Sequence, residues 1–217
     1  MEAEAKVKRR YQSPLRQGQA RNTRTAIIEA AWRLFAEQGY VATSIDEIAG
    51  AAGVSRATVF TAVGGKPVLL KAAFDVAIVG DDEPVSLPER PSSIAIRAEP
   101  DPRVYLDRYA ALVTEVGGRV APIAEAVQGA AGADADAREL WETHLAQRHQ
   151  GAANVVSDIL KKGARLRPEL DPETAADVVW MLNDPGLYDH LVLRRRWPAE
   201  RFQSWLADAL RSQLLGS

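Results

Sequence analysis

The sequence predicts an all-α protein made of an N-terminal three-helix domain and a larger helical C-terminal domain. Apolar residues recur at spacings of three and four along most of the 217 residues, which is the period of a helix that buries one face. Capping residues, glycines and prolines stand at the ends of these stretches, where helices begin and end. A chain of this length can bury a substantial core in one or two domains.

Residues 25–53 predict the first two helices. The first carries one apolar stripe and ends at Gly39, because glycine readily takes the left-handed conformation found just past helix ends. The second opens at Ser44, which forms a capping box with Glu47: each side chain satisfies a backbone N–H of the other residue. The apolar positions of the two helices are Ala26, Ile27, Ala30, Ala31, Leu34, Phe35, Ile45, Ile48, Ala49 and Ala52.

The segment Gly53-Val54-Ser55 joins the second helix to a third that begins at Arg56. Glycine permits a sharp turn, valine fills the core beneath it, and Ser55 caps the third helix. Together these elements form a helix-turn-helix, in which the first residues of the last helix face base edges in the major groove of DNA. Arginine can bond guanine bidentately, and threonine offers a hydroxyl and a methyl group. The residues in these positions are Arg56, Ala57, Thr58 and Thr61.

Residues 24–70 resemble the DNA-binding domain of the tetracycline-repressor (TetR) family of bacterial transcriptional regulators. This pattern covers about a fifth of the chain, and the remainder fits the family in length and helical character. The resemblance implies a DNA-binding domain over 22–65 and a ligand-binding and dimerisation domain over 66–217. The charges, Pro14 and Gly18 predict a flexible basic arm over residues 1–21. The matching residues are Ala30-Ala31, Leu34-Phe35, Gly39-Tyr40, Ala42-Thr43-Ser44, Ile48-Ala49, Ala52-Gly53-Val54-Ser55, Thr58-Val59-Phe60, Lys66 and Leu69-Leu70.

The candidate DNA contacts come from the motif, from the resemblance and from the basic arm. In the family, a lysine at the position of Lys66 lies at a helix start near a phosphate, where free N–H groups favour an anion. Residues 1–24 carry seven Lys or Arg against two Glu, net +5, so the arm is either a DNA contact or a solvated tail. The candidates are Arg10, Arg21, Thr43, Ser44, Ser55, Arg56, Ala57, Thr58, Phe60, Thr61 and Lys66.

One departure from the family lies at the end of the third helix. The family usually has two tyrosines here, flanking one residue and followed by phenylalanine, whereas this chain has Phe60, Thr61, Ala62 and Val63. The tyrosines of the family commonly touch the DNA backbone, so two phosphate hydrogen bonds implied by the resemblance cannot form. Either the DNA contact is weaker than in the family, or another group supplies it.

The composition agrees with a DNA-binding protein of the cytoplasm. Residues 1–66 hold ten Lys or Arg against six Asp or Glu, net +4, while the remainder holds seventeen against twenty-three, net −6. Such asymmetry orients the chain toward DNA. The sequence has no cysteine, no signal-peptide pattern and no long apolar run, so we expect neither disulfides nor contact with a membrane.

The rest of the chain predicts helices over 66–79, 101–116, 119–128, 137–165, 172–193 and 198–215. Residues 80–102 carry five prolines and predict a long loop. We expect Gly117-Gly118 to break one helix, the glycine- and alanine-rich segment 129–136 to be a flexible connection, and Pro185-Gly186 to bend another helix.

The resemblance implies a ligand pocket in the acidic C-terminal domain and a dimer formed by its last two helices. Each candidate also has a simpler explanation, as a core residue or as a residue packed within its own subunit. The pocket candidates are Tyr105, Tyr109, Trp141, His144, Arg148, Trp180 and Met181. The dimer candidates are Leu187, Leu191, Phe202, Trp205, Leu206 and Leu210.

The sequence predicts no enzyme, no cofactor and no metal site. It has no nucleophile elbow, no complete phosphate-binding loop and no zinc-protease motif. His144 and His149 are five residues apart, about 140° around a helix, which does not suit a shared metal. Three hypotheses about function remain open. The first is a repressor that responds to a small-molecule effector of unknown identity, and the second is a small-molecule sensing protein whose DNA binding is weak or atypical. The third is an all-helical enzyme, which no motif of the sequence favours.

Overall fold

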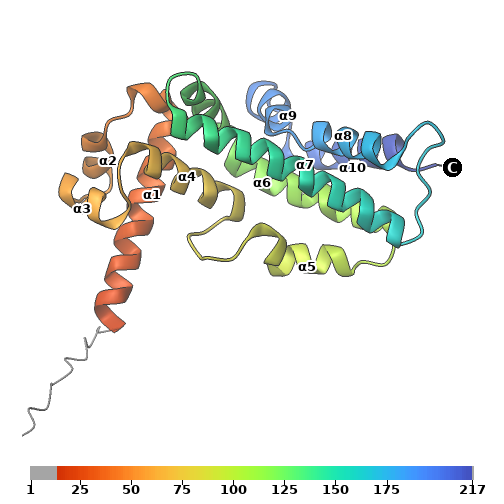
Figure 1. Ribbon diagram of the computed structural model, residues 1–217, viewed down its shortest axis with the longest axis horizontal. Coiled ribbons are helices and arrows are strands. Elements are labelled where there is room, and N and C mark those ends of the chain that lie inside the picture. The colour runs from red at the N-terminus through yellow and green to blue at the C-terminus, as the bar shows by residue number, and fades with distance from the viewer. Residues whose placement is uncertain (1–13, 217) are drawn as a thin grey trace, which may run out of the picture.

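A computed structural model describes residues 14–216, which form helices and turns with one isolated β-bridge between Leu166 and Leu215. The all-α prediction is therefore confirmed. Figure 1 shows a head built by the first three helices and an elongated body built by the later ones. The helices are α1 (Pro14–Ala42), α2 (Ile45–Ala51), α3 (Arg56–Ala62), α4 (Lys66–Val79), η1 (Leu87–Glu89), α5 (Pro91–Ala98), α6 (Pro102–Ala131), α7 (Ala135–Lys161), α8 (Pro172–Leu182), α9 (Pro185–Tyr188), η2 (Asp189–Arg194) and α10 (Ala199–Leu214).

The head follows the local signals of the sequence. Gly39 takes a φ of +80° inside α1 and kinks it, and Ser44 and Glu47 form the expected capping box at the start of α2. The expected arm is corrected, because α1 already begins at Pro14. Proline suits a first helical turn, where its missing N–H has no partner to lose, so residues 14–21 extend α1.

Head and body share one hydrophobic core. Ile27 and Phe35 of α1 are fully buried together with Phe74 of α4 and Ile123 of α6. Each such side chain contributes about 1.5–3 kcal/mol through its removal from water. Two long-range hydrogen bonds add to the contact: the Trp32 indole donates to the Arg119 carbonyl at 3.1 Å, and the Tyr40 hydroxyl donates to Asp134 at 2.8 Å. The head therefore packs firmly on the body.

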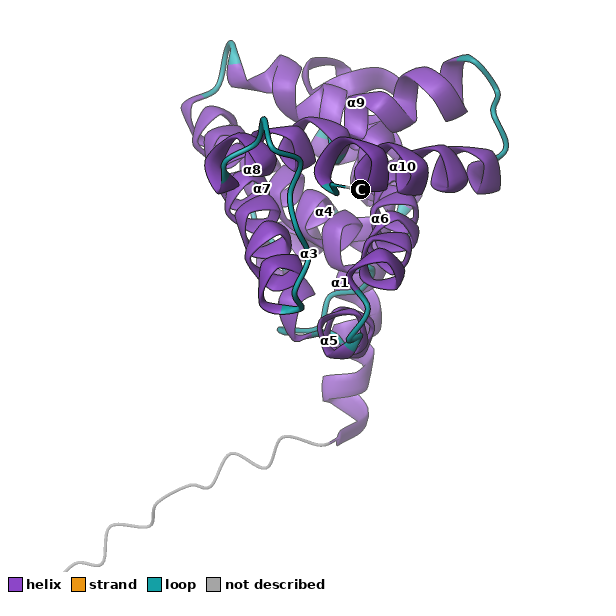
Figure 2. Cartoon of the chain, turned by 90° about the vertical axis from the view of Figure 1, so that its right-hand side faces the viewer, coloured by secondary structure: helices purple, strands orange, loops and turns teal. Residues whose placement is uncertain are grey.

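The body is organised around two long helices, α6 and α7, which run side by side in Figures 1 and 2. The predicted break at Gly117-Gly118 is wrong, because α6 runs through both glycines and through Pro122. Tyr188 of α9 packs so closely on Gly117 that a Cβ there would lie 3.0 Å from its ring. The glycines thus allow α9 to approach α6, and the burial gained by that packing outweighs their low helix propensity.

The predicted loop over 80–102 is also corrected, because it contains η1 and α5. Ser86 and Glu89 form a capping box around η1, and the Arg90 guanidinium bonds both carboxylate oxygens of Asp81 at 2.6 and 2.8 Å. The expected flexible connection over 129–136 is likewise shorter than predicted: α6 continues to Ala131 and α7 begins at Ala135. In both places proline or alanine begins or ends a helix instead of excluding one.

The last helices form the face of the body opposite α5, as Figure 1 shows. The predicted bend near Pro185 becomes a break, since Asn183 and Asp184 separate α8 from α9. Residues 189–194 then form a turn of π-helix, which the periodicity of the sequence did not indicate. α10 packs along α6 and α8.

Candidate functional site

A serine caps the start of α2 and another caps the start of α3. The Ser55 hydroxyl accepts from the backbone N–H of Thr58 at 3.1 Å, and the Ser44 hydroxyl accepts from that of Glu47 at 3.2 Å. Thr43 does not belong to the surface, because its side chain is 1% exposed and its hydroxyl donates to the carbonyls of Gly39 and Leu34. Thr43 as a side-chain DNA contact is therefore corrected: it braces the kink in α1.

The exposed start of α3 carries Arg56, Ala57 and, one turn later, Thr61. The Arg56 guanidinium forms an exposed ion pair with Asp46 of α2 at 2.7 Å and lies 5.6 Å from the centre of the Phe60 ring. An exposed pair of this kind contributes little to stability, so Arg56 can exchange Asp46 for another acceptor at low cost.

The end of α3 is the place where this chain departs from its expected pattern. Phe60 stands 45% exposed on the surface, although a ring of this size gains free energy from burial. The Thr61 hydroxyl donates to the carbonyls of Ala57 and Thr58 within α3, at 3.0 and 3.1 Å. This end of α3 therefore offers an aromatic surface where a phenolic hydroxyl was expected.

Lys66, the first residue of α4, is partly buried between the head and the α6–α7 turn. Its ammonium lies 4.4 Å from the centre of the Tyr40 ring and donates to the Val41 carbonyl at 3.3 Å. Burial lowers the pKa of Lys66, and the negative charges of Asp134 and Glu47 oppose that shift. The ammonium thus already has partners in the head.

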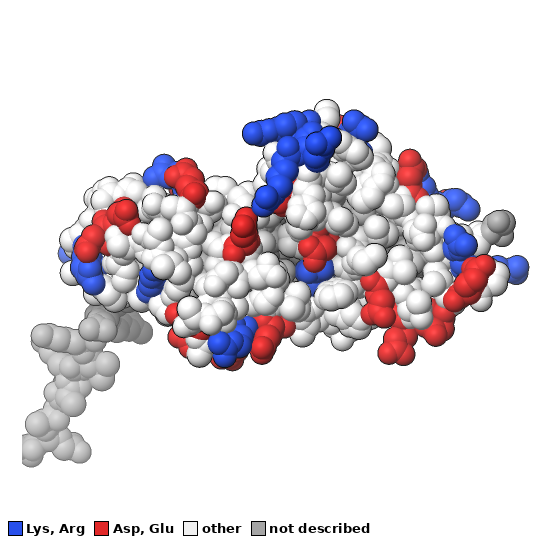
Figure 3. Space-filling model, turned by 90° about the horizontal axis from the view of Figure 1, so that it is seen from above, with Lys and Arg blue, Asp and Glu red and all other residues white. Residues whose placement is uncertain are grey.

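The N-terminal part of α1 lies beside α3. Arg21 is exposed and lines a groove together with Arg24, Thr58 and Thr61, so a basic side chain flanks the third helix. Arg10 lies outside the described residues. Figure 3 shows acidic and basic side chains interspersed on the face that it presents, at the head end as well as over the body.

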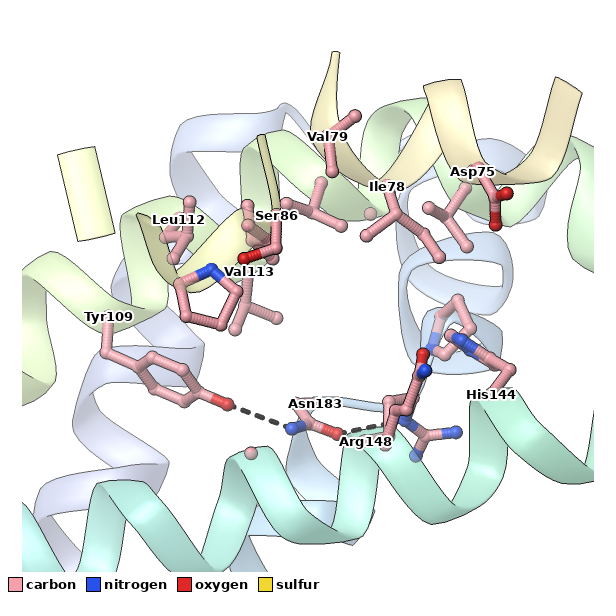
Figure 4. Close-up of a pocket in the computed structure, with 18 of the residues that line it drawn as sticks. Asp75, Ile78, Val79, Ser86, Tyr109, Leu112, Val113, His144, Arg148 and Asn183 are labelled. Carbon is pink, nitrogen blue, oxygen red and sulfur yellow. Dashed lines mark hydrogen bonds between the residues drawn. The ribbon is translucent and has the colours of Figure 1, made fainter. Parts of the chain in front are cut away.

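The body encloses a cavity of about 710 Å³. Its wall is mostly aliphatic, with Ile78 and Val79 from the end of α4, and Leu112 and Val113 from α6. The segment between α4 and α5 closes one side, and polar groups of α6, of α7 and of the break between α8 and α9 gather on the other, as Figure 4 shows. A cavity of this size with few polar groups is typical of a small-molecule site.

The polar side of the cavity is a series of four residues joined by an ion pair and hydrogen bonds. The Arg148 guanidinium pairs with Asp184 at 2.9 Å and donates through Nε to the Asn183 side-chain oxygen at 3.1 Å. The Asn183 amide nitrogen then donates to the Tyr109 hydroxyl at 2.9 Å. Burial lowers the pKa of Arg148, and the Asp184 carboxylate opposes that shift.

His144 lines the cavity one turn before Arg148, with 7% of its surface exposed. Its ring packs edge-on against Phe74, with ring centres 4.8 Å apart, and its Nε2 has no hydrogen-bond partner among the described residues. Burial lowers the pKa of His144 to about 4, helped by the nearby positive charge of Arg148. The imidazole is therefore neutral at physiological pH.

Three of the seven expected pocket residues line this cavity: Tyr109, His144 and Arg148. The other four lie elsewhere. Tyr105 is buried in the core with its hydroxyl bonded to Asp158, and Met181 is 66% exposed on the surface. Trp141 packs against the core shared by head and body, and Trp180 stacks on the outer side of Arg148 at 5.2 Å. Ring size alone did not distinguish core from cavity.

The residues that the sequence reasoning missed lie on other elements. Asn183 and Asp184 come from the break after α8, and Val85 to Pro88 come from the segment expected to be a loop. An Asn-Asp-Pro-Gly sequence is a turn signal, and it could have indicated polar side chains at a helix end. Nothing local marks Val85 or Leu87 as cavity residues.

The expected dimer residues divide into two groups. Phe202, Leu206 and Leu210 are at most 1% exposed, because they form the core of their own chain with α6 and α8. Their assignment to a subunit interface is therefore corrected. Leu187, Leu191 and Trp205 are only partly buried and stay candidates for such a contact.

Residues 14–216 contain neither a metal-binding cluster nor a helix suited to span a membrane. No three His, Asp or Glu side chains gather closely enough to bind a metal ion. None of the helices in that range combines the length and apolar character needed to cross a membrane.

Residues 27–73 match the family described as bacterial regulatory proteins, tetR family. The match spans the head from the middle of α1 onward and the first half of α4. Among curated proteins, none is detectably similar to the chain in sequence.

Solved structures resemble the chain over most of its length. NalD of Pseudomonas aeruginosa, the secondary repressor of the MexAB-OprM multidrug efflux pump, is 22% identical with a TM-score of 0.65; the match covers 91% of this chain and 98% of NalD. FadR of Bacillus subtilis, solved with stearoyl-CoA, is 17% identical with a TM-score of 0.68, covering 87% and 97%. GusR of Salmonella enterica is 20% identical with a TM-score of 0.62, covering 95% and 99%. At these identities the likeness establishes a shared fold.

Proposed function

Because this chain belongs to the tetR family of bacterial regulatory proteins, we propose that it is a repressor that binds a palindromic DNA operator as a dimer and releases it when a small molecule fills the cavity. The observation that carries the proposal is the packing of a capped helix-turn-helix on a body that holds a largely apolar cavity. Its site of action would be the cytoplasm, where bacterial DNA lies.

The DNA-reading surface in this proposal is the start of α3. Arg56 and Thr58 stand in the positions that face base edges in a helix-turn-helix. Arg56 reads a base by leaving Asp46, and Arg21 and Lys66 supply charge toward the phosphates from either side of α3. One such motif reads few base pairs, so a dimer gains affinity by engaging two half-sites about 34–36 Å apart.

The dimer contact in this proposal uses the partly buried side chains of α9, η2 and α10, among them Leu187, Leu191 and Trp205. A two-fold pairing places the same patch on both subunits. FadR of Bacillus subtilis was solved with stearoyl-CoA, which supports a small-molecule effector for the fold without identifying the one used here.

The test is a gel-shift series on a DNA sequence selected by the full chain from a random pool. We expect Arg56→Ala to lower the ratio of specific to random DNA binding, because base contacts carry discrimination of about 1–3 kcal/mol each. We expect Lys66→Ala to weaken binding to all sequences alike and to reduce the salt slope by about 0.9, the effect of one phosphate contact.

Arg103→Ala provides the matched control, since Arg103 is an exposed arginine at the start of α6, far from α3 in Figure 1. It removes the same charge and should leave both quantities unchanged. If Arg56→Ala and Lys66→Ala both bind selected DNA as the unmodified protein does, α3 and α4 are not the DNA-reading surface.

The alternative is a small-molecule sensing protein with weak or atypical DNA binding. It is favoured by Phe60, which replaces an expected phosphate-bonding hydroxyl, and by the pairing of Arg56 with Asp46. Nanomolar, sequence-selective DNA binding at physiological salt would reject it.

A further inference from the structure

The polar side of the cavity fixes the orientation of every hydrogen bond along it. Arg148 Nε can only donate, so the Asn183 atom facing it must be the amide oxygen. The amide nitrogen of Asn183 then faces Tyr109 and donates to its hydroxyl oxygen. Figure 4 shows this succession along one side of the cavity.

Tyr109 therefore ends the chain as an acceptor and keeps its own hydroxyl hydrogen. No described residue accepts that hydrogen, although the hydroxyl is buried and burial raises the pKa of Tyr109. A buried donor without an acceptor is unfavourable, and Tyr109 lies in the wall of a cavity. The wall next to it on the same helix is apolar and includes Leu112 and Val113. The hydrogen is thus available to one acceptor atom of a molecule that is otherwise apolar.

The positive charge beside Tyr109, that of Arg148, is already paired. Arg148 serves Asp184, Asn183 and, through Nη2 at 2.8 Å, the Trp180 carbonyl. Asp75, on the α4 side of the cavity, pairs with Lys71 at 2.5 Å. A carboxylate beside Tyr109 would lose its hydration and could gain Arg148 only by displacing Asp184, which is costly for a buried charge. An ammonium beside Tyr109 would lose its hydration as well, because the other carboxylates of the lining, Asp75 and Glu83, belong to exposed residues.

We propose that the cavity binds an uncharged, largely apolar molecule and selects it through one carbonyl-type oxygen that accepts the Tyr109 hydroxyl hydrogen. The inference that this molecule is the effector rests on the proposed function, whereas the inference that the cavity binds it does not. Tyr109 is the residue that determines specificity, and Asn183 is a positioning residue that holds the hydroxyl in its donating state.

The experiment is isothermal titration calorimetry of the full chain with three probes that each contain an unbranched ten-carbon chain: decan-2-one, decanoate and decyltrimethylammonium. We expect decan-2-one to bind at least about tenfold more tightly than either ion. In Tyr109→Phe its affinity should fall about fivefold to tenfold, the effect of one net hydrogen bond. Tighter binding of decanoate than of decan-2-one, absence of decan-2-one binding, or equal affinity in Tyr109→Phe would overturn the proposal.

Two further variants make the result specific. Tyr105→Phe is the matched control: it removes a buried hydroxyl one turn earlier on α6 that bonds Asp158 outside the cavity wall, so decan-2-one affinity should not change. Asn183→Asp keeps shape but presents only acceptors, so Tyr109 donates to it and the probe loses its partner. Asn183→Asp should therefore lower the affinity for decan-2-one as Tyr109→Phe does, and it keeps the test valid if Tyr109→Phe folds poorly. Unchanged affinity in Asn183→Asp also overturns the proposal.

DNA binding of the unliganded full chain, measured in parallel, separates the two proposals. If selected DNA is not bound while decan-2-one binding still depends on Tyr109, the repressor function fails and the assignment of the cavity stands. If selected DNA is bound while Tyr109→Phe leaves probe affinity unchanged, the reverse holds.

Discussion

Replacing Gly117 by alanine tests how closely α9 packs on α6. The added Cβ would lie 3.0 to 3.2 Å from three atoms of Tyr188, where ordinary carbon contacts begin near 3.5 Å. The Tyr188 ring cannot retreat freely, because it packs edge-on against the buried Phe202 with ring centres 5.2 Å apart. Overpacking of this kind costs about 1–3 kcal/mol, and alanine returns about 1 kcal/mol through its higher helix propensity. We expect a net loss of about 1 kcal/mol.

Gly129→Ala is the control for this prediction, since Gly129 also lies inside α6 and has open space where its Cβ would be. It should gain about 0.5–1 kcal/mol from helix propensity alone. Thermal unfolding of both variants measures the difference, which should be several degrees, with Gly117→Ala below the unmodified protein and Gly129→Ala above it. If Gly117→Ala were as stable as Gly129→Ala, the close approach of Tyr188 would not constrain α6.

Two further predictions concern groups that join the cavity to the rest of the molecule. The pKa of His144 is about 4 in the folded protein, against an ordinary value of 6.5. Between these two pH values the unfolded chain binds more protons than the folded one, so stability should fall as the pH drops from 6.5 toward 4. The loss should reach up to about 3 kcal/mol. Urea unfolding at several pH values should show a smaller fall for His144→Gln, and an identical fall would contradict the buried neutral imidazole. Arg24→Gln removes the hydrogen bonds to Asp82 and to the Ala62 carbonyl. Stability should change by less than about 1 kcal/mol, because the Arg24–Asp82 ion pair is partly exposed. Decan-2-one should alter the operator affinity of this variant less than that of the unmodified protein. An unchanged ratio of operator affinities with and without the probe would separate Arg24 from the switch.

The head could be predicted from the sequence because its signals are local. Ser44 and Glu47 are three residues apart, and Ser55 directly precedes the helix that it caps, so both caps are visible in short segments. Pro14 and Gly18 predict an arm over residues 14–21, because proline and glycine often interrupt helices. Pro14 instead begins α1, which shows that proline position within a helix matters more than its presence.

The cavity could be predicted only in part, because its residues meet through tertiary packing. Tyr109 and Asn183 are 74 residues apart, and their hydrogen bond depends on how α6 and α8 pack with α7. Helical spacing did place His144 and Arg148 one turn apart on one helix, and both line the cavity. The amphipathic stripe of α10 gave no such help, since Phe202 would show the same spacing in a core or in a dimer contact.

Two elements connect the cavity to the head. One is α4 itself, and the other is the segment that follows the end of α4. Ile78 lines the cavity, and Arg119 of α6 bonds the carbonyls of Ala77 and Ile78 at 2.9 and 3.3 Å, which anchors the end of α4 to the body. Beyond it, Asp82 bonds Arg24, and Arg24 also bonds the last carbonyl of α3.

A ligand that fills the cavity contacts both the end of α4 and the segment that follows Asp82, which supplies Val85 to Pro88 to its wall. It can shift the heads only if it binds one arrangement of these elements more tightly than the other. Arg24 connects that segment to α3, whereas Arg119 connects α4 to the body. A displacement of the segment would therefore reach α3 directly. The loss of coupling between ligand and DNA binding in Arg24→Gln measures how much of the switch depends on this contact.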